Sequence, residues 1–129
     1  MPVSYKPVGY NSLSPYLIVD GAQKMIALLQ TIFDAKLTRQ FDSPDGKIMH
    51  AELMIDDSIL MLSDSTKDYA PNQTVLHVYV TDAAATFKKA IAAGCTSQQE
   101  PVQKNDPDLR GTFIDFAGNM WSVGTQTTI

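Results

Sequence analysis

Blocks of apolar residues along the chain predict strands and helices in a recurring order. In the first half these are a strand at 13–19, a helix at 22–33 and strands at 36–41, 48–55 and 58–63. The helix prediction depends on apolar residues that recur every three or four positions between Ala22 and Phe33. The last two strands flank Asp56-Asp57, which is typical of a hairpin turn.

The second half repeats this order. It predicts a strand at 75–80, a helix at 83–93, a weak strand at 97–102 and a closing hairpin formed by 110–115 and 120–125. Thr81 or Asp82 is the expected N-cap of the helix, with Phe87 and Ile91 facing inward. "LIVDGA" is echoed by "VYVTDA" about 60 residues later, which indicates an internal duplication.

Each half is too small to bury a core alone, so the whole chain, 1–129, is predicted to be one domain. Its two modules span 11–64 and 74–126, and the polar stretch 65–73 links them. The predicted fold class is α+β, with two tandem βαβββ modules. They are expected to form a cupped mixed sheet with the helices on its convex face.

Strand alternation assigns the residues to sheet faces. A two-residue turn at 56–57 places Ile55 opposite Ser58, Leu53 opposite Leu60 and Glu52 opposite Met61. The face expected to pack on the helices carries Leu13, Leu17, Val19, Ala51, Leu53, Ile55, Leu60, Leu62, Leu76, Val78, Val80, Trp121 and Val123. The opposite face carries Ser14, Tyr16, Ile18, His50, Glu52, Met54, Ile59, Met61, Ser63, Val75, His77, Tyr79, Met120 and Ser122. Its mixture of aromatic, sulfur and polar groups suits a ligand cleft or a subunit interface.

Composition narrows the class of partner. The net charge is −4 and the basic residues are scattered, which argues against nucleic acid. No apolar run reaches the roughly 18 residues of a membrane span, and the beginning of the sequence does not suggest a secretion signal. A single cysteine, Cys95, cannot form an internal disulfide and is expected in a reducing, cytoplasmic setting. We expect Cys95 to be a small packing residue at the end of a helix.

Four segments carry a resemblance to a known family: "SPYLIVDGAQKMIALLQTIFDAKL", "DGKIMHAELMIDDSILMLSD", "HVYVTDAAATFKKAIAAG" and "RGTFIDFAGNMWSV". Their order and spacing resemble the vicinal oxygen chelate superfamily, also called the glyoxalase/bleomycin resistance/dioxygenase family, and most of all its bacterial glyoxalase-like members. The resemblance covers nearly the whole chain. It implies paired βαβββ modules, commonly in a homodimer, around a site for a small organic molecule.

Metal-dependent members of that superfamily place one ligand on each of four strands. Matched onto this chain, those positions fall at Ser14, Met61, Val75 and Ser122. None of these side chains is a suitable ligand for a hard divalent ion, which prefers imidazole or carboxylate. The closing hairpin also departs from the family, with Phe116 where proline is often seen and Asn119 where histidine is often seen. The expectation is therefore that the usual metal set is missing.

Polar residues near those positions leave alternatives open. A shift of the match by two residues brings in His77 or Glu52, and with His50 they are candidate catalytic residues. They could form a displaced site for a divalent metal or an acid–base set, because burial beside aromatic rings shifts the pKa of such groups. They could equally bond only to cross-strand neighbours or to a partner chain.

The preferred hypothesis is a cytoplasmic, homodimeric, small-molecule-binding protein without the usual four-ligand metal site and with no confidently assigned cofactor. The alternative is a metal-dependent lyase, isomerase or dioxygenase-like enzyme with its displaced site at His50, Glu52 and His77, and whether the chain is an enzyme stays open. A third hypothesis is a structural or regulatory dimer. Arg110 could meet an anionic ligand or pair with Asp108. The predicted ligand-binding residues are Ser14, Tyr16, Met54, Met61, Val75, Tyr79, Arg110 and Ser122.

Overall fold

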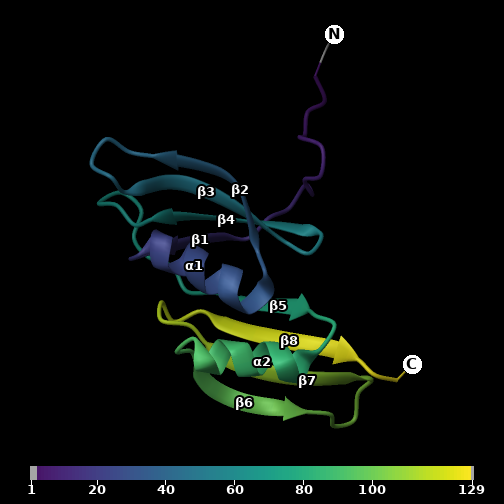
Figure 1. The fold of residues 1–129 in the computed structure, drawn as a ribbon. Coiled ribbons are helices and arrows are strands. Elements are labelled where there is room, and N and C mark those ends of the chain that lie inside the picture. Colours follow the sequence, from purple (N-terminus) through teal and green to yellow (C-terminus); the bar gives the residue numbers. More distant parts are fainter. Residues whose placement is uncertain (1–2, 129) are drawn as a thin grey trace. The chain divides into compact units, whose positions relative to one another are not determined.

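The computed structural model describes residues 3–128, which form two helices and eight strands (Figure 1). In chain order the elements are β1 (Tyr16–Val19), α1 (Ala22–Phe33), β2 (Lys36–Asp42), β3 (Ile48–Ile55), β4 (Ser58–Asp64), β5 (Val75–Tyr79), α2 (Ala83–Ala92), β6 (Thr96–Val102), β7 (Asp108–Ile114) and β8 (Met120–Gln126). Each half therefore has the order strand, helix and three strands, as the sequence predicted.

The strands form two four-stranded mixed sheets, ordered β1-β4-β3-β2 and β5-β8-β7-β6. In each sheet the first strand pairs in parallel with the last one, and the remaining pairs are antiparallel. The first compact unit runs to Asn72 and the second begins at Gln73, except that Thr31–Phe33 group with the second unit. The predicted fold class, α+β with two βαβββ modules, is confirmed.

The predicted register of the first hairpin is also confirmed. Ile55 pairs with Ser58, Leu53 with Leu60 and Glu52 with Met61. The aliphatic face is buried as expected, and both Leu53 and Leu62 have no exposed surface.

The opposite face differs from the prediction, because Glu52, Ile59 and Ser63 are buried there as well. Part of that face is covered by the segment before β1. The Tyr10 hydroxyl donates to Glu52, and the Ile59 amide donates to the Asn11 side chain at 3.3 Å. The chain thus supplies part of its own cover for this sheet face.

Two predicted core positions are wrong. Leu13 is 84% exposed, because β1 begins only at Tyr16 and Pro15 has no amide hydrogen to extend the ladder. Ile91 is 37% exposed, since the buried stripe of α2 consists of Ala83, Phe87 and Ala90.

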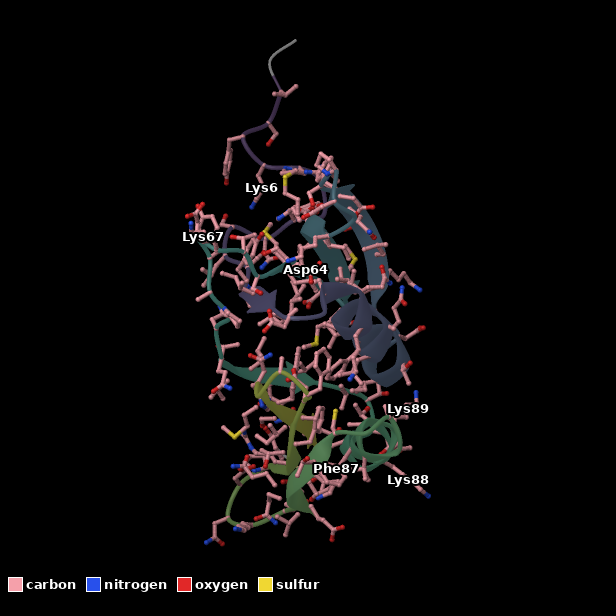
Figure 2. The ribbon with its side chains drawn as sticks, turned by 90° about the vertical axis from the view of Figure 1, so that its left-hand side faces the viewer. Lys6, Asp64, Lys67, Phe87, Lys88 and Lys89 are labelled. Atoms are coloured by element: carbon pink, nitrogen blue, oxygen red, sulfur yellow. The ribbon has the colours of Figure 1, made fainter. Side chains whose placement is uncertain are left out.

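Figure 2 shows Phe87 on the side of α2 nearest the strands, while Lys88 and Lys89 extend away from them. Asp82 caps this helix by accepting from the Ala85 amide at 3.0 Å, which selects between the two predicted N-caps. Trp121 is 1% exposed and packs in the core of the second module, as strand parity predicted. Among the described residues, neither helix is long and apolar enough to span a membrane.

One carboxylate joins three parts of the first module. Asp64, at the end of β4, accepts from the Ala22 amide at 2.8 Å and from the Gly21 amide at 3.3 Å, so it caps the start of α1. Its other oxygen accepts from the Ile48 amide at 2.8 Å, at the start of β3. The equivalent position in the second module is Thr125, whose hydroxyl accepts from the Ala83 amide at 2.8 Å.

We expect Asp64→Ala to lower the free energy of unfolding by about 2–4 kcal/mol, because three backbone amides lose their acceptor. Urea unfolding followed by circular dichroism measures this change. Asp68→Ala is the matched control, since Asp68 is exposed and its variant should stay within about 0.5 kcal/mol of the parent chain. Equal stability of the two variants would contradict the role of Asp64.

Candidate functional site

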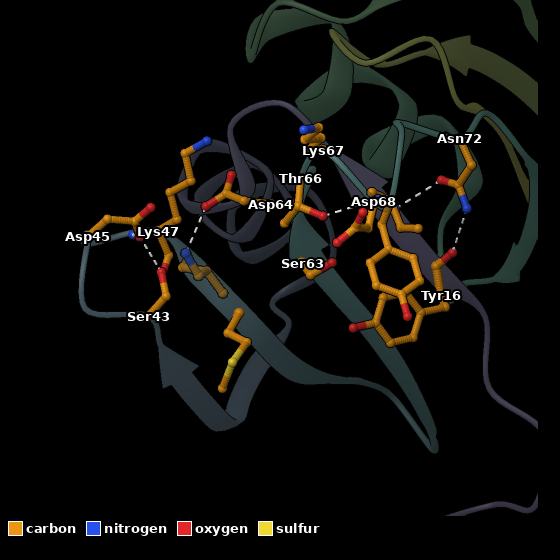
Figure 3. A pocket seen from close by; sticks show the side chains of 14 residues that line it. Tyr16, Ser43, Asp45, Lys47, Ser63, Asp64, Thr66, Lys67, Asp68 and Asn72 are labelled. Atoms are coloured by element: carbon orange, nitrogen blue, oxygen red, sulfur yellow. Dashed lines mark hydrogen bonds between the residues drawn. The ribbon is translucent and has the colours of Figure 1, made fainter.

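The first module contains a cavity of about 910 Å³. It opens beside β1, the start of β3 and the segment that follows β4. Its apolar and aromatic lining comes from Tyr16, Ile18, Ile48, Met49 and Tyr69, its uncharged polar lining from Ser43, Ser63, Thr66 and Asn72, and its charged lining from Asp45, Lys47, Asp64, Lys67 and Asp68. Figure 3 shows these side chains around the opening. The volume lies within the range of small-molecule pockets, about 300–1,000 Å³.

Hydrogen bonds fix the wall formed by the segment after β4. The Asn72 side chain accepts from the Ile18 amide at 2.9 Å and donates to the Tyr16 carbonyl at 3.0 Å, as Figure 3 shows. Thr66 accepts from the Tyr69 amide at 3.1 Å. This segment reads in the sequence only as a polar linker, so its part in a cavity was not predicted. Asn72 is the one sequence signal for this role, because an asparagine side chain can hydrogen bond to a neighbouring backbone and so hold a loop against the sheet.

Among the predicted ligand-binding residues, Tyr16 lines this cavity. Met61 lies beside it in the sheet, paired with Tyr16 on one side and with Glu52 on the other. Ser14, Met54 and Met61 are half-buried on the same module but do not line the cavity.

Glu52 is the most buried of the predicted catalytic residues, at 3% exposure. Its carboxylate accepts from the Tyr10 hydroxyl and from the Nε2 atom of His50 at 2.7 Å, and the Nε atom of Arg39 lies 3.7 Å away. Burial raises the pKa of Glu52, but the hydrogen bonds from Tyr10 and His50 and the charge of Arg39 outweigh it, so that its pKa lies below the usual value. Glu52 is therefore a carboxylate at neutral pH.

His50 connects Glu52 to the cavity. Its Nδ1 atom lies 3.0 Å from the hydroxyl oxygen of Tyr16, and its ring lies between those of Tyr16 and Phe41, with centroid distances of 5.6 Å and 6.4 Å. Glu52, His50 and Tyr16 thus form a continuous hydrogen-bonded chain that ends at a cavity-lining residue.

The remaining candidates belong to the second module. The Nδ1 atom of His77 lies 2.9 Å from the Ser122 hydroxyl, and Tyr79 donates to Asp108 at 2.7 Å. Partial burial, reinforced by the charge of Arg110, lowers the pKa of His77, while the hydrogen bond to Asp108 raises that of Tyr79.

Arg110 pairs with Asp108 and with Asp106, at 3.1 Å in each case, so the predicted pairing with Asp108 is present. Val75 is 65% exposed on the same sheet. The predicted ligand-binding residues of this module therefore surround a network of polar contacts rather than the cavity of the first module.

The donor atoms at the four positions implied by the family do not fit a hard divalent ion. Ser14 and Ser122 offer neutral hydroxyls, Met61 a thioether and Val75 no donor atom at all. In the part of the chain that the structure describes, no three or more His, Cys, Asp or Glu side chains are grouped so that they could hold a metal ion. Burial raises the pKa of the Cys95 thiol to about 11, so this cysteine remains protonated and inert.

The ionic bonds of Glu52 predict a pH-dependent stability. Because the pKa of Glu52 is lower in the folded than in the unfolded chain, its contribution is complete above the ordinary value of 4.5. It is lost as the pH falls through the folded value. We expect Glu52→Gln to be less stable than the parent chain at pH 7, with the difference shrinking below about pH 4.5. Urea unfolding across this pH range measures it.

Glu100→Gln is the matched control, because Glu100 is an exposed glutamate of the second module. A stability difference for Glu52→Gln that stays constant with pH would contradict the ionic role.

Comparisons with known proteins agree with this architecture. An uncharacterised protein of Mycobacterium bovis is 33% identical over 124 residues, which cover 88% of this chain and 82% of that protein. The crystal structure of protein PA1353 from Pseudomonas aeruginosa matches with a TM-score of 0.73 and 24% identity, covering 90% of this chain and 98% of that one. The fosfomycin resistance protein FosX of Listeria monocytogenes, complexed with Mn(II) and sulfate, matches with a TM-score of 0.70 and 15% identity, covering 91% and 90% of the two chains.

The structural likenesses, all below 25% identity, show the shared fold. The family model described as the Glyoxalase/Bleomycin resistance protein/Dioxygenase superfamily matches residues 10–123, nearly the whole chain. The resemblance found in the sequence is thereby confirmed: the chain belongs to the glyoxalase/bleomycin resistance protein/dioxygenase superfamily.

Proposed function

We propose that this protein binds a small organic molecule with an apolar, aromatic body and an acidic substituent, in the cavity of the first module. The observation that carries the proposal is the cavity itself, about 910 Å³ in volume and lined by two tyrosines and a methionine. Met49 and Tyr69 are 61% and 66% exposed, although both are large apolar side chains. A ligand seated between them would remove this apolar surface from water.

Two lysines among the charged groups around the cavity, Lys47 and Lys67, support an acidic substituent on the ligand, and Asp68 lines the cavity as well. Asp64 is occupied by three backbone amides, and Asp45 accepts from Ser43 and from the Lys47 amide at 3.1 Å. Within residues 3–128, the ammonium groups of Lys47 and Lys67 have no carboxylate within 4.0 Å. These lysines are available to pair with an anionic group on the ligand.

Membership of the superfamily supports a ligand-binding role, since the description of the family includes bleomycin resistance proteins and FosX is a fosfomycin resistance protein. We also propose that the chain acts in the cytoplasm as a homodimer. Val75 and Tyr79 support the dimer, because they leave apolar surface exposed on the sheet of the second module. The displaced metal site at His50, Glu52 and His77 has less support, because each histidine is hydrogen bonded within its own module.

The first test uses the probe 8-anilinonaphthalene-1-sulfonate, which combines an aromatic body with one anionic group. We expect saturable binding of one probe per chain, measured by fluorescence titration. Tyr69→Ala should raise Kd about tenfold, the effect of losing an aromatic wall. Tyr5→Ala is the matched control, since Tyr5 is 89% exposed and lies outside the cavity.

The Lys67→Ala variant tests the contribution of the ligand's acidic group separately from that of its aromatic body. It should weaken binding of the sulfonate probe and leave the Kd of the uncharged N-phenyl-1-naphthylamine unchanged. Absence of saturable binding, or equal effects of Tyr69→Ala and Tyr5→Ala, would overturn the proposed cavity. Equal weakening of both probes by Lys67→Ala would overturn the role of this lysine.

A further inference from the structure

The hydrogen-bonded chain from Glu52 to the cavity has a defined direction. Glu52 is a buried carboxylate that accepts from Tyr10, so it can only accept from His50 as well. The Nε2 atom of His50, 2.7 Å from Glu52, must therefore carry the proton. In the neutral imidazole this leaves Nδ1 as an acceptor, and the Tyr16 hydroxyl, 3.0 Å away, donates to it.

The solvent exposure of the side chains increases along this series of hydrogen bonds, from Glu52 to Tyr16. Glu52 is 3% exposed, the His50 side chain is 24% exposed and Tyr16 is 40% exposed. Tyr16 lines the cavity, whereas Glu52 and His50 do not. Tyr16 is therefore the member of this hydrogen-bonded series that borders the cavity.

We propose that Tyr16 is a catalytic residue that transfers a proton to and from a small organic molecule in this cavity, with His50 as the base behind it. The proposal rests on the proposed function, because it needs a ligand in the same cavity. His50 and Glu52 are positioning residues, since they act through Tyr16. The substrate class is a molecule with a weakly acidic C–H or O–H proton, and the reaction class is isomerisation by proton transfer.

The proton step balances within these groups. The Tyr16 O–H bond breaks as its proton moves to Nδ1 of His50, and the Tyr16 oxygen takes the ligand's proton. The products are a neutral Tyr16, a ligand anion and a His50 imidazolium paired with the Glu52 carboxylate. Return of a proton by the reverse path to a different atom of the ligand completes the isomerisation. No further reactant is needed, and Glu52 stabilises the charge that forms on His50.

The second module provides a comparison within the same chain. His77 lies 61 positions after Tyr16, and its Nδ1 atom bonds to the Ser122 hydroxyl at 2.9 Å. In the described part of this module, no carboxylate forms a salt bridge with the His77 ring, as Glu52 does with that of His50. The buried carboxylate, the imidazole and the hydroxyl of a cavity-lining tyrosine come together in the first module.

The proton relay formed by Glu52, His50 and Tyr16 can be tested without a substrate. The test is acetylation of the tyrosine side chains with N-acetylimidazole. The reagent acylates the phenolic oxygen, and a base that takes its proton speeds the reaction. Tyr69 is a matched internal control, because it lines the same cavity. Peptide mass spectrometry then gives the rate at each tyrosine. We expect Tyr16 to react on the order of 100-fold faster than Tyr69, at the lower end of the effect of a positioned base.

His50→Gln keeps a side chain that can donate to Glu52 and accept from Tyr16 but cannot act as a base. We expect it to reduce the Tyr16 rate to that of Tyr69 while thermal unfolding is unchanged. The charged and titratable groups around His50 are Glu52 on β3, Tyr16 on β1 and, beside Glu52, Arg39 on β2 and Tyr10.

A Tyr16 rate no faster than that of Tyr69, or a rate unchanged in His50→Gln, would overturn the relay whether or not the cavity binds a ligand. Saturating 8-anilinonaphthalene-1-sulfonate should protect Tyr16 from acetylation. Unprotected Tyr16 with bound probe would show that its hydroxyl does not face the ligand. Failure of the probe to bind would count against the proposed function, and the comparison of Tyr16 with Tyr69 would still decide the relay.

Discussion

The first module depends on a single acceptor, the carboxylate of Asp64. The first amides of a helix have no partner within the helix, and burying them without an acceptor is unfavourable. Asp64 supplies that acceptor to Gly21 and Ala22 with one oxygen and holds the Ile48 amide with the other. It therefore fixes the start of α1 and the start of β3 relative to the end of β4.

The cavity follows from the same constraint. Asp64 and Ile48 both line it, so the bond that organises the module also sets the position of two of its walls. In the second module Thr125 takes this role at the equivalent position and donates in turn to the Val80 carbonyl at 2.8 Å. The two modules therefore hold the start of their helix in the same way, although the accepting side chain is a carboxylate in one and a hydroxyl in the other.

Alternation and turn chemistry were sufficient to predict the elements, the hairpin register and the aliphatic core apart from Leu13 and Ile91, because these features depend mainly on neighbours in the chain. The site was less predictable, because it depends on contacts between distant residues. The hydroxyl of Tyr10 reaches Glu52 across 42 positions, and the Asn72 side chain returns to β1 across 54 positions. Parity placed Glu52 on the correct face, but it could not show that the N-terminal segment covers it.

This cover decides which residue can meet a ligand. A glutamate that keeps its charge while buried must be hydrogen bonded, and each oxygen of Glu52 accepts a hydrogen bond from within the first module. Because Glu52 is buried, it can act on a ligand only through a neighbouring group that both accepts and donates protons. His50 is such a group, and its second nitrogen faces Tyr16. Because Glu52 is buried away from the cavity, Tyr16 is the residue of this group that lies where a ligand would bind.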